Sequence, residues 1–130
     1  RDVMDVVAKC GELRTIPIPT PERMPHIQAV AQDGIELCIR AEIVCQLHNI
    51  TNLVRGVSEA VLIARTGTAI VEEVGATATH TNVLADLDGM ADRILAQRLD
   101  EDTPFRIAVL RIVEAKVGRD IGAMHRDGLI

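Results

Sequence analysis

The strongest constraint on this chain is a long run of alternating apolar and polar residues that follows Asp33-Gly34. From Ile35 to Leu47 every second position is apolar, and most positions between them are polar or charged. Successive side chains of a β-strand point to opposite faces, so the run predicts one long strand with a buried face and a wet face. Antiparallel sheets permit a strand of this kind.

Two neighbouring segments add strands or connectors to it. Asp-Gly lies between residues 26–31 and the long run, which predicts a β-hairpin with a type I′ turn, because Gly accepts a positive φ. Residues 15–24 contain Pro17, Pro19 and Pro21. Proline lacks the N–H that a central strand needs, so this segment is expected to be a connector or an edge strand.

Apolar residues at helical spacing predict helices at residues 2–10, 58–74, 79–85 and 87–99, with a short turn ending at Gly56. Gly75 is expected to end the longest helix in the left-handed conformation. Residues 105–117 read as a second long strand, and because both of its faces are apolar it is predicted to lie in the middle of the sheet. The order of elements predicts an α+β fold, an antiparallel sheet of long strands with helices packed on one face.

The longest predicted helix carries more apolar residues than one buried stripe requires. Its predicted core stripe is Ala60, Ile63, Ala64, Gly67, Ile70, Val71 and Val74. Gly67 lies within this stripe, where its missing side chain would let the helix approach the sheet. Val61, Leu62 and Ala69 fall outside the stripe, beside Glu73. Either a loop covers these residues or they form a contact ridge for a partner subunit, with Val61, Leu62, Ala69 and Glu73 as the candidate contacts.

Composition excludes several classes of function. The 130 residues are enough for one domain, and 48% of them are apolar, but Phe105 is the single aromatic residue, so stacking platforms for bases are absent. The net charge is -5 and the basic residues are scattered, which argues against nucleic acid as a partner. The longest apolar run is too short to span a membrane, so this segment itself is expected to be soluble.

No catalytic or metal-binding constellation emerges, and no cofactor is expected. Ser58 is interpreted as a helix N-cap rather than a nucleophile, since the second glycine of a nucleophile elbow is replaced by alanine. The four histidines lie in different segments, and no CxxC motif occurs. Cys38 and Cys45 are seven residues apart on one predicted strand, so they face opposite ways and cannot pair. Arg111, which interrupts an apolar face, is expected to form an ion pair with Glu36 or Glu42.

Four ordered segments resemble those of the bacterial flotillin-like proteins, members of the stomatin–prohibitin–flotillin (SPFH, or band 7) superfamily. The similarity spans residues 1–123, and it rests on VAQDGIEL (30–37), LVRG (53–56), IARTG with IV (63–67 and 70–71) and VGRDIGA (117–123). The resemblance implies an SPFH domain at residues 1–123 and the start of a C-terminal region at 124–130. Residues 124–130 lack the polar, helix-forming sequence with which the family continues after this domain.

The resemblance also implies a function for the whole protein, with a membrane-inserted segment before this domain and a coiled-coil helix after it. Such proteins are non-enzymatic scaffolds on the cytoplasmic face of the bacterial cell membrane. They form large homo-oligomers that organise membrane microdomains, and they contact membrane lipids and membrane proteins, including a membrane-anchored OB-fold partner. The alternative is an accessory module that docks a membrane protease or another membrane protein partner.

Overall fold

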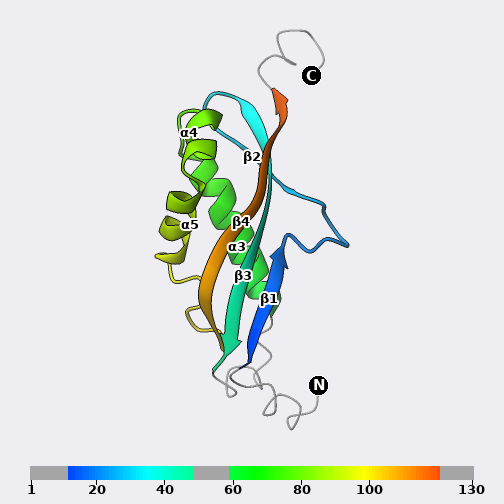
Figure 1. Cartoon of the computed structure of the whole chain (residues 1–130), viewed down its shortest axis with the longest axis vertical. Helices are drawn as coiled ribbons and strands as arrows, with labels where there is room; N and C mark the ends of the chain where they lie inside the picture. Colours follow the sequence, from blue (N-terminus) through cyan, green and yellow to red (C-terminus); the bar gives the residue numbers. More distant parts are fainter. Residues whose placement is uncertain (1–11, 49–58, 121–130) are drawn as a thin grey trace.

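The computed structural model describes residues 12–48 and 59–120, which form one antiparallel sheet covered on one face by helices (Figure 1). In chain order the elements are β1 (Leu13–Ile18), β2 (Ile27–Val30), β3 (Ile35–Leu47), α3 (Glu59–Gly75), α4 (His80–Ala85), α5 (Leu87–Leu95) and β4 (Phe105–Asp120). The predicted α+β class is confirmed. The predicted helix at 2–10 and the turn ending at Gly56 lie outside the described residues.

The long strand predicted from alternation, β3, is the centre of the sheet. Along one edge it pairs with β2 through its first half and with β1 through its second half, and along the other edge it pairs with β4 over its whole length. Strand β1 is therefore an edge strand, as its prolines predicted. Strand β4 pairs only with β3 among the described residues, so the prediction that it lies in the middle of the sheet is wrong.

The hairpin between β2 and β3 is confirmed, but its turn differs from the prediction. The amide of Gly34 donates to the carbonyl of Ala31, and Gly34 has φ 81°. Within this turn only Gly34 has a positive φ, whereas a type I′ turn needs two such residues. The arrangement is a type I turn followed by a left-handed glycine, the usual form of a three-residue hairpin loop.

Strand β4 contains three β-bulges at intervals of five residues. Ala108, Val113 and Gly118 have no partner in the register with β3, and each one reverses which alternate positions face the helices. The residues paired with the inward side chains of β3 from Leu37 to Leu47 are Phe105, Ile107, Leu110, Ile112, Ala115 and Val117. The bulges thus explain why β4 seemed apolar on both faces. At Gly118 a Cβ would lie 2.6 Å from the Cys38 Sγ, so a larger residue at this bulge would force the Cys38 thiol to move.

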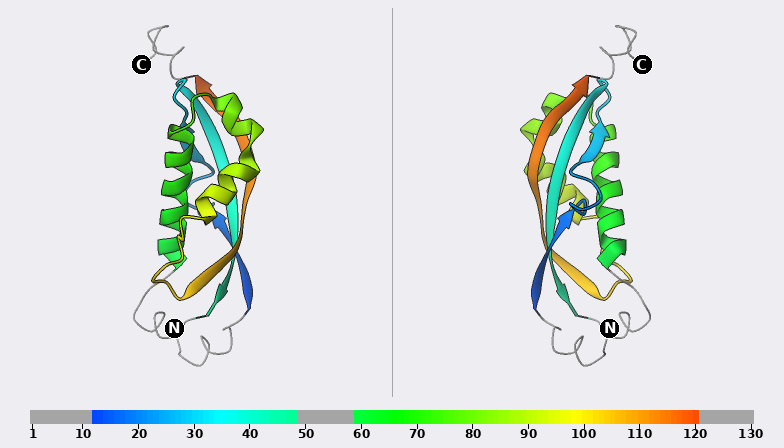
Figure 2. Two further views of the ribbon diagram at one scale, coloured as in Figure 1. Left: turned by 90° about the vertical axis from the view of Figure 1, so that its left-hand side faces the viewer. Right: turned by 90° about the vertical axis from the view of Figure 1, so that its right-hand side faces the viewer.

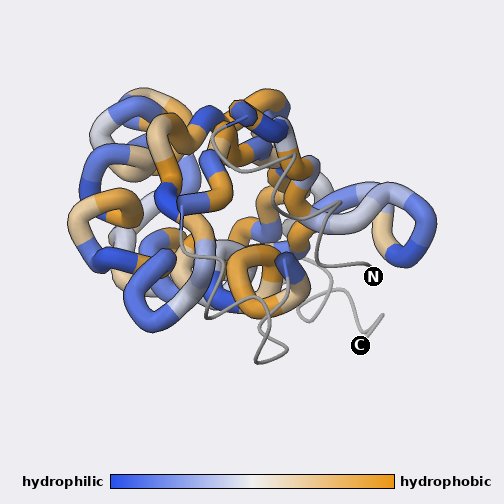
Figure 3. The backbone as a smooth tube through the Cα atoms, turned by 90° about the horizontal axis from the view of Figure 1, so that it is seen from below, coloured by the Kyte–Doolittle hydropathy of each residue, from blue (hydrophilic) through white to orange (hydrophobic). Residues whose placement is uncertain are grey.

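The helices pack on the face formed by the odd-numbered residues of β3 (Figure 2). Helix α3 lies against β1 and β2, and α5 lies against β4. The core between the layers is mostly aliphatic and Phe105 is its single aromatic residue, as the composition required. Seen from below, residues 19–26 project from the edge of the sheet away from the helices, and they are mostly hydrophilic (Figure 3).

The helix ends differ from the predictions by a few residues. Gly75 belongs to α3 and is not left-handed, since Gly34 is the positive-φ glycine among the described residues. Thr79, predicted as the first residue of a helix, instead caps α4 by accepting from the amide of Asn82. Helix α5 ends at Leu95, four residues before the predicted end, and Arg98 beyond it has φ 55°.

Gly67 does not mark a close approach of α3 to the sheet. A Cβ built at this position would lie 4.0 Å from the Ile27 Cδ1, which is an ordinary contact distance. The interpretation of Gly67 as a notch for close packing is therefore wrong.

Candidate interaction surfaces

The predicted contact ridge on α3 is mostly part of the core. Leu62 is 0% exposed and Ala69 is 2% exposed, so neither side chain is available to a partner subunit. Val61 is partly buried, and Glu73 pairs with Arg93 at 3.2 Å between Oε2 and Nε. The ridge as a continuous surface is wrong, and a contact role for Val61 or Glu73 stays a prediction.

The buried stripe of α3 also differs from the predicted one. It contains Leu62, Thr66, Ala69, Ile70 and Val74, whereas the predicted core residues Ala60, Ala64 and Val71 are exposed. The helix is apolar around most of its circumference, so the periodic pattern did not select one face. Thr66 is a polar residue in the middle of the buried stripe, so a count of apolar residues did not find that stripe.

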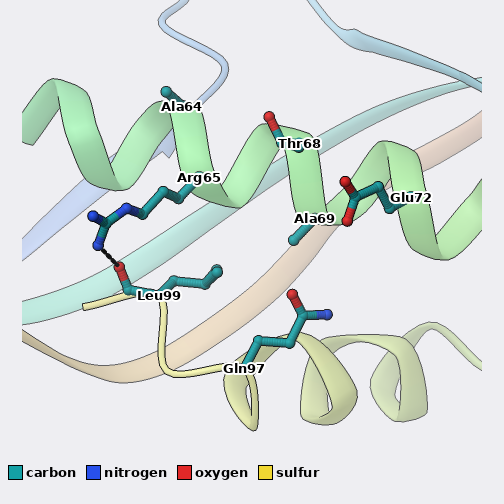
Figure 4. Close-up of a pocket in the computed structure, with 7 residues that line it drawn as sticks. All are labelled: Ala64, Arg65, Thr68, Ala69, Glu72, Gln97 and Leu99. Carbon is teal, nitrogen blue, oxygen red and sulfur yellow. Dashed lines mark hydrogen bonds between the residues drawn. The ribbon is translucent and has the colours of Figure 1, made fainter. Parts of the chain in front are cut away.

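A shallow groove of about 330 Å³ runs between α3 and the segment after α5 (Figure 4). Ala64, Arg65, Thr68, Ala69, Glu72, Gln97 and Leu99 line it. The Arg65 Nη1 donates to the carbonyl oxygens of Leu99 at 3.0 Å and Glu101 at 2.8 Å. Arg65 thus ties the loop before β4 to the helix, so its guanidinium has a structural role in this groove.

A second groove, of about 350 Å³, lies beside that loop. It is lined by His48, Arg98, Asp100, Glu101, Asp102, Thr103, Phe105 and Arg106. In this groove the Asp100 Oδ2 accepts from the amide of Ile107 at 2.8 Å, and Asp102 has φ 61°. Across the described residues, no group of three His, Cys, Asp or Glu side chains could hold a metal ion.

The sheet face opposite the helices carries a set of ion pairs. Arg111 pairs with Glu42 at 2.7 Å between Nη2 and Oε1, which confirms an ion pair between β4 and β3 at this position. This position is exposed rather than buried, since the Arg111 side chain is 62% exposed. Glu114 contacts the Lys116 Nζ at 3.2 Å and the His26 Nε2 at 3.3 Å. Hydrogen bonds from Lys116 and then His26 lower the pKa of Glu114.

Three basic side chains recur on this face at intervals of five residues. Arg106, Arg111 and Lys116 pair in register with Gln46, Glu42 and Cys38 of β3, all on its outer side. We call these three residues the basic ladder. In a regular strand a separation of five would place neighbours on opposite faces, and the bulges at Ala108 and Val113 restore them to one face. Sequence reasoning missed the ladder, although the five-residue recurrence was visible.

The remaining reactive residues lie apart from one another. Cys38 lies on the outer side of β3 and Cys45 in the core, as the alternation predicted, and burial raises the pKa of the Cys45 thiol. The Asp33 carboxylate joins the hairpin to α4 by accepting from the His80 Nδ1 at 2.8 Å and the His80 amide at 2.9 Å. Ser58, Cys10 and His125 lie outside the described residues.

None of the helices in the described ranges is both long and apolar enough to cross a membrane. The observed architecture defines an α+β domain with one sheet face under helices and one face without them. Comparison with known proteins then identifies the family. The family model described as Flotillin-like protein FloA matches residues 1–128, so the chain belongs to the flotillin-like FloA family.

Individual relatives agree with this assignment. The chain is 40% identical over 99 residues to Flotillin-like protein FloA of Finegoldia magna, a match that covers 76% of this chain and 30% of that protein. It is 34% identical over 125 residues to Flotillin-like protein FloA 1 of Rhodopirellula baltica, covering 95% of this chain and 36% of that protein. The chain therefore spans about a third of the length of the curated relatives it matches.

Proposed function

We propose that this chain is a non-catalytic scaffold domain of a membrane-associated flotillin-like protein, which organises membrane microdomains through homo-oligomerisation. The observation that carries the proposal is the family match over residues 1–128. Four ordered sequence segments that resemble the SPFH superfamily support the same assignment. The expected location is the cytoplasmic face of the bacterial cell membrane.

The described surfaces are compatible with a scaffold. Their two grooves are shallow, and the polar residues in them hold the loop before β4 in place. A scaffold acts through broad contacts with lipids, other copies and client proteins, and these need exposed faces rather than a deep cleft. A membrane-anchored OB-fold protein is the proposed protein partner.

The test is fractionation of bacterial cells that express the intact protein, followed by native electrophoresis of the membrane fraction. We expect the protein in the membrane fraction as a large homo-oligomer. A monomer confined to the soluble fraction would overturn the proposal.

Partner capture from the same membranes tests the scaffold role separately. A scaffold should recover several membrane proteins together with other copies of itself. A single dominant protease, recovered without homo-oligomers, would instead assign the accessory role.

A further inference from the structure

In the described part of the chain no helix covers the sheet face opposite α3–α5, which we call the bare face; His26, from the segment before β2, contacts it at Glu114. Along β4 the bare face presents the basic ladder, whose members are separated by four residues of the paired strand β3. At about 3.3 Å per residue the rungs stand roughly 13 Å apart. Arg111 and Lys116 also contact Glu42 and Glu114, whereas no ion pair within the described residues involves Arg106.

Exposed apolar side chains accompany the basic ladder. Val109 is 42% exposed and pairs in register with Val44, an outer-face residue of β3, while Leu13 of β1 is 66% exposed and pairs with Gln46. Val113, at a bulge between two rungs, is 57% exposed. Basic residues interleaved with exposed aliphatic residues are the combination that binds the interface of an anionic bilayer.

The opposite side of the molecule has the opposite charge. Residues 59–102, which comprise the three helices and the loop before β4, contain nine carboxylates and three arginines. An anionic surface would repel this layer and attract the basic ladder, so the charge distribution favours a single orientation. The overall charge of -5 therefore conceals an acidic helix layer and a more basic sheet face.

We propose that the bare sheet face binds an anionic lipid surface, with the basic ladder at the headgroup phosphates and Leu13, Val109 and Val113 at the interface below them. The inference rests on the proposed membrane function and names the surface that makes the contact. Helix layer α3–α5 then faces away from the membrane, where other proteins can reach it.

The test is flotation of the 130-residue chain with phosphatidylcholine vesicles that contain or lack phosphatidylglycerol. We expect the chain to float with the anionic vesicles and to be released by salt, since Lys and Arg near an anionic surface contribute through screened attraction. The Arg106→Glu/Lys116→Glu variant should bind at least tenfold more weakly, because each basic residue near such a surface contributes about a fivefold change.

A matched control separates the face from net charge. Arg23→Glu/Arg93→Glu changes the total charge equally at two exposed positions, one in the segment before β2 and one on α5, and it should alter binding less than twofold. Circular dichroism verifies that each variant folds, and the milder Arg106→Gln/Lys116→Gln variant replaces the first one if that does not fold. Equal binding by the ladder variant and the wild type, or equal loss in the control, would overturn the proposal.

Sedimentation of the free chain distinguishes lipid from a second copy as the occupant. A wild-type oligomer that the ladder substitutions dissociate, without flotation of either form, would assign the face to self-association and refute the lipid proposal. Recovery of the intact protein in the cell membrane fraction remains independent of these results. If that result is positive and the ladder variant still floats, only the choice of face is wrong.

Discussion

Thr66 offers the sharpest test of how α3 packs. Its side chain is 0% exposed, and its hydroxyl oxygen has no hydrogen-bond partner within the part of the chain that the structure describes. A buried, unpaired polar group costs about 1–3 kcal/mol of the free energy of unfolding. Valine has nearly the same shape as threonine and replaces the hydroxyl by a methyl group.

We therefore expect Thr66→Val to stabilise the domain by about 1–2 kcal/mol, because the unpaired hydroxyl is removed while the two residues have similar helix propensity. For a chain of this length each kcal/mol raises Tm by roughly 4 °C. Chemical denaturation in urea gives the free energy of unfolding, and an unchanged m-value would show that the denatured state is unaffected.

Thr68 supplies the matched control, because it lies on the same helix and is exposed. Thr68→Val should change stability by less than about 0.5 kcal/mol. If Thr66→Val destabilises the domain, the Thr66 hydroxyl has a partner in the folded protein, and the inference that it is an orphaned polar group is refuted.

Three further predictions concern the helices and the hairpin. Leu62→Glu should unfold the domain, as judged by circular dichroism, because it buries a charge at a fully enclosed position. Val61→Glu, at the neighbouring position, should leave the domain folded. A folded Leu62→Glu variant would restore the hypothesis of a partner ridge. Gly67→Ala should raise stability by up to about 1 kcal/mol in urea denaturation, since alanine favours helix and its Cβ meets no clash; a loss of stability would show close packing instead. The hydrogen bond from the His80 side chain, followed by that from its amide, lowers the pKa of Asp33. This carboxylate thus contributes stability above its unfolded pKa and loses it as pH falls through the lower folded value. Asp33→Asn should therefore lower Tm at neutral pH, with a deficit that shrinks below about pH 4; a deficit that does not vary with pH would contradict this.

Alternation was a reliable guide where one strand is paired on both edges and covered on one face. It gave β3 in full, its hairpin partner, and the opposite orientations of Cys38 and Cys45. It failed for β4, because bulges depend on the register between two strands and shift the inward positions after Ala108 and Val113. A fixed period of two cannot represent these shifts, so β4 was predicted to be apolar on both faces and central.

The surfaces were harder to predict than the elements. The sequence of α3 offers several apolar stripes, and the choice among them depends on where β1 and β2 lie against the helix. The ion pair between Arg111 and Glu42 was predictable from charge and strand type, whereas the basic ladder required the bulged register.

The regular spacing of the bulges also affects whether other molecules can add strands to the outer edge of β4. Strand β4 has 16 residues and, among the described residues, pairs along one edge only; a long unpaired edge can recruit strands from other molecules into fibrils. Between Ala108 and Val113, however, only four residues continue without a break in register. A strand added at this edge would therefore meet a bulge after a few residues, and so short a regular segment is a poor template for fibril growth.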